Sequence, residues 1–279
     1  MGILKMIAIN NVSKNYGGKA LFRNISFVIG RGEKIGLIGP NGVGKSTLFS
    51  MILGDLEPST GNIRLSKGIR MGYLPQEASF LSRHTVLSEL MYGDEFIARL
   101  IREKKVLEEK NEAASRRYGE ILYELDARGY FELEHKSKKV LAGLGFKQVD
   151  FARPITQMSG GWQMRVLLAK LLVFHYDILL LDEPTNYLDL NAALWFKNYL
   201  AGFKRGFVMI SHDRAFLDEV TNYTLVIENG SVFKVKRNYE HYKRIRDDKY
   251  VSLLKKFKEQ EKRRKQLEKF IARFHGQPN

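Results

Sequence analysis

The chain has 279 residues, of which 44% are hydrophobic and 28% are charged, and its formal net charge is +15 at pH 7. This is the composition of a folded globular protein. The sequence has no apolar run of about 18 residues, the length that would predict a membrane-spanning helix. The absence of cysteine excludes disulfides, cysteine-based zinc sites and thiol catalysis. Because the N-terminus also lacks a signal-peptide pattern, we expect a cytoplasmic protein with no membrane insertion.

In chain order, the first 75 residues predict short strands separated by tight turns, at 6–9, 25–29, 35–38, 63–65 and 71–74. The pattern then becomes helical and highly charged over 84–144. The second half predicts a helix from Gly161, a strand at 178–181, a helix near 192–200, a strand at 207–210 and a closing hairpin at 225–235. Strands that alternate with helices, and strands that are apolar throughout, predict a parallel sheet covered on both faces.

The last predicted element is a long helix that starts near Tyr239. Residues 234–274 contain sixteen Lys or Arg and six Asp or Glu, so about two thirds of the net charge lies there. Two apolar sets at helical spacing, within 250–257 and 267–274, flank a wholly polar stretch at 260–266. A helix with this pattern needs a partner helix, another molecule or both. A solvated charged face is the alternative for the basic residues, but their concentration favours a polyanion, RNA above all.

One glycine-rich loop indicates nucleotide binding. Residues 39–47 (GPNGVGKST) fit the pattern G-x-x-x-x-G-K-[ST], follow the predicted strand at 35–38 and precede a predicted helix that ends at Gly54. The glycines let backbone N–H groups approach phosphates, Lys45 would reach the β- and γ-phosphates, and the Ser46 hydroxyl would ligate Mg²⁺. The loop residues expected to bind the nucleotide are Gly39, Asn41, Gly42, Gly44, Lys45, Ser46 and Thr47. A glycine-rich turn with a chance Lys-Ser is the alternative.

Two further segments carry candidate site residues. The strand at 178–181 ends in Asp182 and Glu183, at the sheet edge where open α/β sheets bind ligands. Asp182 would join the Mg²⁺ shell, and Glu183 would orient the attacking water. Ser159, Gly160 and Gly161 open another helix, where Ser159 serves as a helix cap or the segment forms a second anion site.

Together these motifs resemble the ATP-binding cassette (ABC) family. The resemblance implies an α/β P-loop cassette with a mixed sheet that has an antiparallel part, a RecA-like core and a helical subdomain. In that family the segment at Ser159, Gly160 and Gly161 grips the γ-phosphate held by a second cassette. The other matching positions are Tyr16 for adenine stacking, Gln76 near Mg²⁺ and water, Asp189 in the D-loop and His212 as the switch histidine. Glu183, His212 and Gln76 would then be catalytic, Ser46, Gln76 and Asp182 would hold the metal, and the cofactors would be ATP and Mg²⁺.

The subtype resembles ABC-F. The family's signature is the segment that begins at Ser159; the residues just before it (151–156) include no acid, and Trp162 follows its two glycines. The segments 184–189 (PTNYLD) and 211–217 (SHDRAFL) match ABC-F variants. ABC-F members have two cassettes in one chain, joined by a charged helical hairpin that reaches into the ribosome. The resemblance implies a cassette at 1–238 with a helical subdomain at about 84–175, then the start of a truncated linker at 239–279.

The implied partners follow from this subtype. They are a second cassette, in cis or in a homodimer, and the ribosome or another RNA through 234–274. Since each ATP would lie between two cassettes, we expect slow hydrolysis by one cassette alone. The alternatives are the ATP-binding subunit of a membrane transporter and a non-catalytic RNA-binding protein.

Overall fold

The computed structural model describes residues 5–17, 19–77, 84–92, 95–236 and 239–274. Its centre is a six-stranded sheet, and its first five strands run parallel whereas the last is antiparallel to its neighbour. In spatial order these are β5 (Met71–Leu74), β6 (Ile178–Asp182), β7 (Gly206–Ile210), β3 (Lys34–Ile38), β8 (Tyr223–Glu228) and β9 (Ser231–Lys236). The predicted parallel sheet and its closing hairpin are confirmed.

A second, antiparallel sheet has the order β2 (Lys19–Gly30), β1 (Lys5–Tyr16) and β4 (Thr60–Leu65). The prediction of short strands was wrong here, because β1 and β2 are 12 residues each. The register shifts between Ile9 and Val12, where Asn11 has a φ of 50°. This bulge places polar residues inside the strand, and the apolar alternation therefore stops before the strand does.

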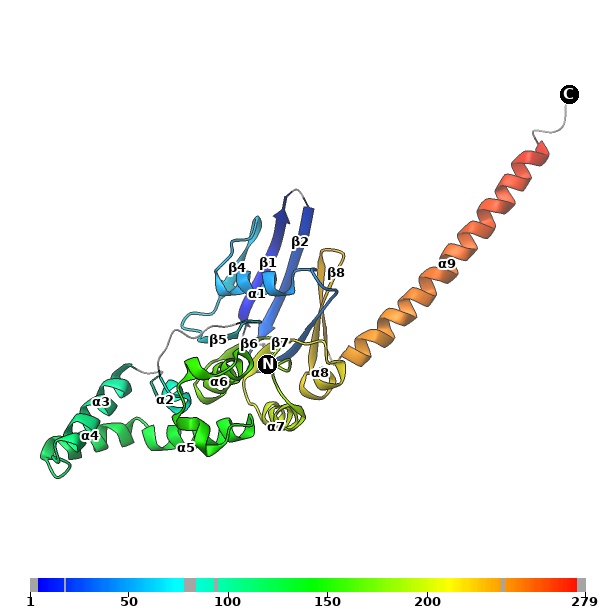
Figure 1. Cartoon of the computed structure of the whole chain (residues 1–279). Coiled ribbons are helices and arrows are strands. Elements are labelled where there is room, and N and C mark those ends of the chain that lie inside the picture. Colours follow the sequence, from blue (N-terminus) through cyan, green and yellow to red (C-terminus); the bar gives the residue numbers. More distant parts are fainter. Residues whose placement is uncertain (1–4, 18, 78–83, 93–94, 237–238, 275–279) are drawn as a thin grey trace.

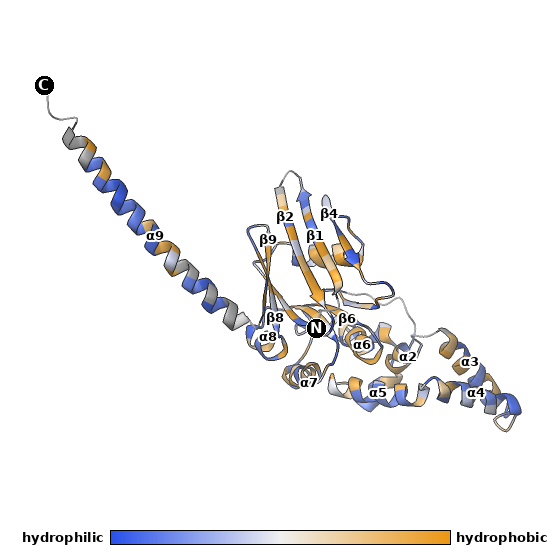
Figure 2. Ribbon diagram, turned by 180° about the vertical axis from the view of Figure 1, so that it is seen from behind, coloured by the Kyte–Doolittle hydropathy of each residue, from blue (hydrophilic) through white to orange (hydrophobic). Residues whose placement is uncertain are grey.

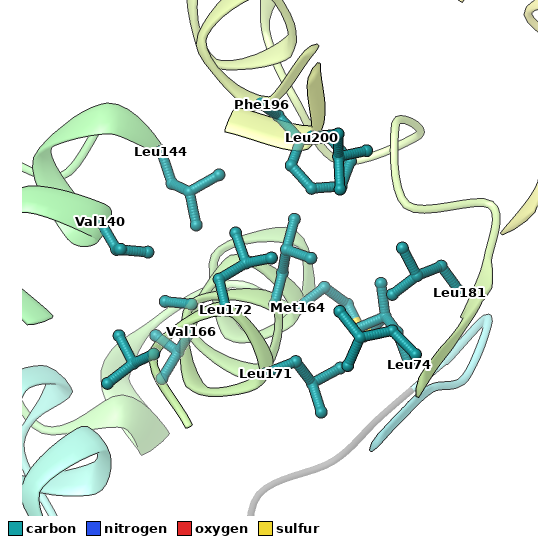
Figure 3. Close-up of a cluster of buried hydrophobic side chains, with 14 of the residues drawn as sticks. Leu74, Val140, Leu144, Met164, Val166, Leu171, Leu172, Leu181, Phe196 and Leu200 are labelled. Carbon is teal, nitrogen blue, oxygen red and sulfur yellow. The ribbon is translucent and has the colours of Figure 1, made fainter. Parts of the chain in front are cut away.

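Both faces of the central sheet are covered, as predicted. Leu179, Leu181 and Met209 lie in the core beneath α6 (Gly160–Val173), α7 (Leu190–Ala201) and α8 (Arg214–Val220), part of which is drawn in Figure 3. Their neighbours along the same strands, Leu180 and Ile210, belong to the opposite core with α1 (Lys45–Leu53), β1 and β2. Successive side chains of a strand point to opposite faces, so wholly apolar strands fill both cores.

A helical lobe extends from one end of this core (Figure 1). It consists of α2 (Val86–Met91), α3 (Glu95–Glu109), α4 (Arg116–Ala127) and α5 (Tyr130–Gly143), followed by short 3₁₀ turns at Gln148–Ala152 and Ile155–Gln157. Helices α3 and α4 have their own small core around Leu100, Ile121 and Leu125. The helical pattern of this region is confirmed, whereas the bounds proposed for the domain and its subdomain stay predictions.

The last element is α9 (Tyr239–Phe274), a helix of 36 residues that projects away from the core (Figures 1 and 2). It contacts α8 and β8. Along the helix, Leu253, Phe257 and Leu267 are 60–65% exposed, and Figure 2 shows apolar bands separated by hydrophilic stretches. Among the described residues, no helix has the length and apolarity needed to cross a membrane.

Candidate nucleotide site

The glycine-rich loop joins β3 to α1 and allows no larger residue at two positions. Gly44 has a φ of 104°, and a Cβ there would lie 2.8 Å from side-chain atoms of Leu21 and Phe22. A Cβ on Gly39 would lie 2.8 Å from the carbonyl oxygen of Ile227. Both glycines are therefore required by the close approach of neighbouring atoms, and Gly44 also by its backbone conformation. The predicted helix after the loop is confirmed, and it ends at Gly54.

Lys45 is folded over the loop. Its Nζ donates to the carbonyl oxygens of Gly39 at 3.0 Å and Pro40 at 3.2 Å. An ammonium group forms stronger hydrogen bonds with anionic oxygens than with neutral carbonyls. The side chain is thus placed where a phosphate could replace a carbonyl as its acceptor.

Ser46 and Asp182 meet although 136 residues separate them, since the Ser46 Oγ donates to the Asp182 Oδ2 at 2.8 Å. Asp182 is 3% exposed, and this burial raises its pKa, whereas Ser46 and Lys45 oppose the rise. The described residues contain no cluster of three or more His, Cys, Asp or Glu that could hold a metal. A hydroxyl beside one carboxylate nevertheless fits Mg²⁺, which is usually bound by one or two carboxylates together with substrate phosphates.

Glu183 follows Asp182 at the end of β6 and faces His212, which follows the neighbouring strand β7. Glu183 is 5% exposed and has a φ of 50°. Its Oε2 accepts from the His212 backbone N–H at 3.2 Å, and its Oε1 lies 3.3 Å from the His212 Nε2. Among the described residues Oε1 has no hydrogen-bond donor. Burial raises the pKa of Glu183, and Asp182 adds to the rise, whereas His212 and Lys45 oppose it.

These residues surround one open pocket of about 360 Å³. It is lined by Asn41, Gly42, Gly44, Lys45, Ser46, Thr47, Gln76, Asp182, Glu183, Ile210 and His212. Gly39 lies in an adjoining pocket that shares Asn41, Lys45 and His212. The structure therefore brings together the predicted loop, the two carboxylates, the glutamine and the histidine.

The remaining predicted residues do not line this pocket. Tyr16 is 51% exposed at the end of β1, with the Lys14 Nζ 5.3 Å from its ring centre. Ser159 and Gly160 are exposed, and Gly161 is half-buried. Ser159 occupies the N-cap position of α6, but its side chain makes no capping hydrogen bond. The predicted N-cap position of Ser159 is thus confirmed, whereas its side chain does not form the hydrogen bond expected of a cap.

Asp189 caps α7 and is held by an arginine that the sequence analysis did not identify. Its carboxylate accepts from the Ala192 N–H and from the Arg165 Nη1, both at 2.9 Å, and these bonds lower its pKa. Arg165 is 9% exposed and also donates to the carbonyl oxygens of Leu144 at 3.0 Å and Tyr187 at 2.6 Å. The buried arginine thus connects the helix that starts at Gly160 with the 187–189 segment.

Tyr187 is the second residue that the sequence analysis missed. Its hydroxyl donates to the carbonyl oxygen of Gln76 at 2.6 Å, and a Cβ on Gly161 would lie 3.5 Å from its ring. One side chain therefore bonds the glutamine that lines the pocket and lies beside the half-buried Gly161. An aromatic residue inside the PTNYLD segment was the available signal, but no local pattern shows its partners.

A family model described as ABC transporter matches residues 22–186. The chain belongs to this ATP-binding cassette family. Cassettes of the family bind ATP with Mg²⁺, hydrolyse it and work in pairs. The arrangement of the loop, Asp182 and Glu183 around one pocket is the part of this cassette that fits such chemistry.

Curated relatives and solved structures resemble the cassette. YfmM of Bacillus subtilis, described as an uncharacterized ABC transporter ATP-binding protein, is 33% identical over 278 residues, which cover 97% of this chain and 54% of YfmM. YheS of Escherichia coli K12, a probable ATP-binding protein, is 31% identical and matches 97% of this chain and 42% of YheS. The chain thus spans about half the length of these relatives.

Among solved structures, the ATP-binding subunit of an ABC transporter superposes with a TM-score of 0.64 at 20% identity, and the match covers 89% of this chain and 99% of that subunit. At this identity the likeness shows a shared fold.

Proposed function

We propose that this cassette is the first of two in an ATPase of the ABC-F type, and that α9 couples its nucleotide cycle to the ribosome. The observation that carries the proposal is α9 itself. It extends for 36 residues outside the core, and every described side chain between 251 and 260 is exposed. Residues 234–274 carry about two thirds of the net positive charge of the chain. A helix of this kind suits a polyanionic partner.

The proposed chemistry is hydrolysis of the terminal phosphate of ATP. Lys45 binds the β- and γ-phosphate oxygens, and Ser46 and Asp182 hold Mg²⁺, which when bound neutralises charge on those oxygens. Glu183 takes a proton from the attacking water at its Oε1, the buried oxygen that has no donor among the described residues. The His212 backbone N–H orients the carboxylate by donating to its Oε2, the His212 ring lies beside Oε1, and Gln76 closes the side of the pocket.

The second half of each site comes from another cassette in this proposal. Ser159, Gly160, Gly161 and Asp189 lie outside the pocket of about 360 Å³, and the first two are exposed on the surface. They would grip the nucleotide of the partner cassette, while the exposed Tyr16 ring would stack on adenine. The length of the relatives supports the pairing, because this chain covers 54% of YfmM and 42% of YheS. A single cassette would then hydrolyse ATP slowly.

Sedimentation with ribosomes tests the proposal. The chain and its Glu183→Gln variant are spun with ribosomes in ATP or ADP over a salt series. We expect the variant to be retained in ATP, with a retention that weakens as salt rises. Lys262→Gln together with Arg263→Gln should reduce this retention, whereas Arg102→Gln together with Lys139→Gln, which remove the same charge from exposed positions on α3 and α5, should not.

Failure to sediment under all conditions, for this chain and for a two-cassette version, would overturn the ribosomal role. The name of YfmM contains the words ABC transporter, and a transporter subunit is therefore the second candidate. Nucleotide-dependent retention on membrane vesicles, without retention on ribosomes, would favour that candidate. Turnover that does not depend on protein concentration would contradict the composite site.

A further inference from the structure

A second basic surface lies on the side of the central sheet opposite the nucleotide pocket. Strands β5, β6 and β7 are parallel, and the residues just before them therefore meet at one edge. Arg70, Asp177 and Arg205 occupy these positions, and the Asp177 carboxylate accepts from the Arg70 backbone N–H at 2.9 Å. Glu183 and His212 follow the strands β6 and β7 at the other edge. An open pocket of about 660 Å³ lies here, between the sheet edge and α5. We call it the rear pocket.

The charged lining of the rear pocket is almost wholly basic. Its ionisable side chains are Arg70, Arg128, Lys136, Lys170 and His175, with Glu132 as the single carboxylate. Lys170 is compensated by Glu89 at 2.7 Å. Within the described residues, no ion pair is formed by Arg70, Arg128 or Lys136. The pocket therefore keeps an excess of positive charge.

The basic groups of this region are held by neutral atoms rather than by acids. The Lys136 Nζ donates to the Val173 carbonyl oxygen at 2.5 Å, and the Arg205 Nη1 donates to the Tyr176 carbonyl oxygen at 3.2 Å. Burial, and then the proximity of Arg205, lower the pKa of Lys136. Neighbouring like charges thus remain together because main-chain carbonyls fix their positions.

His175 completes a set of donors. The Arg205 Nη2 lies 2.7 Å from the His175 Nδ1. A guanidinium can only donate, so Nδ1 accepts and the imidazole proton is on Nε2. Arg205 is the main cause of the lowered pKa of His175, followed by burial, Arg70 and Lys136, while Asp177 opposes them. A neutral histidine in the lining of the pocket keeps one N–H, on Nε2, with which it can donate to a ligand as the cations do.

We propose that the rear pocket binds a phosphate group of an RNA backbone. Donors that converge from separate elements with little opposing acid suit an oxyanion, and arginine is well matched to phosphate. Arg70, Arg128 and His175 are exposed at its rim, which leaves room for a chain that continues on both sides. The Arg128 guanidinium is steadied over the Phe96 ring at 3.9 Å. The inference rests on the proposed function and adds a second RNA contact, lined in part by α5, a helix of the lobe that lies on the other side of the cassette from α9 (Figure 1).

The test measures binding of a fluorescein-labelled single-stranded RNA of about 20 nucleotides, longer than a typical binding site. Fluorescence anisotropy is recorded over a salt series with saturating Mg·ADP, which occupies the glycine-rich loop. The test variant carries Arg70→Glu and Arg128→Glu. The matched control carries Arg102→Glu and Lys139→Glu, two exposed residues of α3 and α5 outside the pocket. Basal ATPase activity and thermal unfolding confirm that both variants are folded.

We expect the rear-pocket variant to bind RNA at least about fivefold more weakly than the control, with a shallower dependence of log K on log salt by about 1. Equal losses in the two variants would overturn the site. A second result would also overturn the RNA site. If inorganic phosphate binds the wild type but not the rear-pocket variant, while both bind RNA with equal affinity, the rear pocket is a site for free phosphate. If only Lys262→Gln with Arg263→Gln weakens RNA binding, the proposed function stands and the rear pocket falls. If the wild type binds no RNA, both fall.

Discussion

The substitution Glu183→Gln should stabilise the nucleotide-free cassette while it removes hydrolysis. Glutamine retains the shape of the side chain and the oxygen that accepts from the His212 N–H at 3.2 Å. It removes a charge from a position that is 5% exposed, where Oε1 lacks a hydrogen bond. Burial penalises the charged carboxylate more than the neutral amide that replaces it, because desolvation of an unsatisfied polar group costs about 1–3 kcal/mol and that of a charged group costs more. We therefore expect the free energy of unfolding to rise by about 1–2 kcal/mol, or the Tm by about 2–6 °C.

The gain in stability from Glu183→Gln should grow as pH rises. Burial raises the folded-state pKa of Glu183 above its ordinary value of 4.5, so the folded protein holds this proton more tightly than the unfolded chain. The wild type then loses stability as pH rises from about 4.5 through the folded-state pKa, whereas glutamine does not titrate. The pKa of Asp182 is also raised, but Asp182 is present in both proteins. The Tm difference should be small near pH 4 and largest above neutrality.

Differential scanning fluorimetry of nucleotide-free protein between about pH 4 and 8.5 measures this difference. Glu112→Gln, at an exposed carboxylate between α3 and α4, controls for the loss of one negative charge and should leave the Tm unchanged. Phosphate release assays follow hydrolysis in the same samples. A Tm of Glu183→Gln equal to or below that of the wild type at pH 8, or a difference that is largest at low pH, would refute the argument.

Three further substitutions test other contacts. Lys45→Ala should weaken binding of fluorescent ADP by about 10- to 100-fold, because a charge-assisted contact to phosphate is lost; unchanged affinity would contradict its role. Tyr187→Phe removes the 2.6 Å bond to the Gln76 carbonyl and should lower kcat several-fold at nearly constant KM; a rise in KM alone would argue against positioning. Arg165→Met should lower the free energy of unfolding by about 3 kcal/mol in urea titrations, since it leaves two main-chain carbonyls and the Asp189 carboxylate without their donor. A loss below about 0.5 kcal/mol, typical of a surface site, would rule this out.

Much of the sheet was predictable because its strands are apolar on both faces. The prediction for 71–74 matches β5, and that for 178–181 matches β6 except for its last residue. The strands of the antiparallel sheet were underestimated, because the bulge at Asn11 interrupts the alternation that marks a strand. The breaks between α3, α4 and α5 were not anticipated either, since charged helices and the turns between them differ little in composition.

The nucleotide pocket was predictable to the extent that its residues occur in local motifs. The loop, the two carboxylates, Gln76 and His212 line it or adjoin it. Contacts between distant segments were not predictable. The Tyr187 hydroxyl and the Gln76 carbonyl are 111 residues apart, and the donor is an aromatic side chain that any core could use. In the sequence Arg165 is one of several basic residues of a helix, and only the structure shows its three acceptors.

The position of α9 gives the cassette a mechanical property. Strand β9, which precedes α9, is bonded to β8, and β8 is bonded to β3, the strand that leads into the glycine-rich loop. The 36 residues of α9 correspond to about 54 Å of helix. A tilt of about 5° at its base would displace its far end by about 5 Å, the rise of one helical turn. A rearrangement at the glycine-rich loop that is too small to disturb the core would thus move any molecule bound at the far end of α9 by several ångströms.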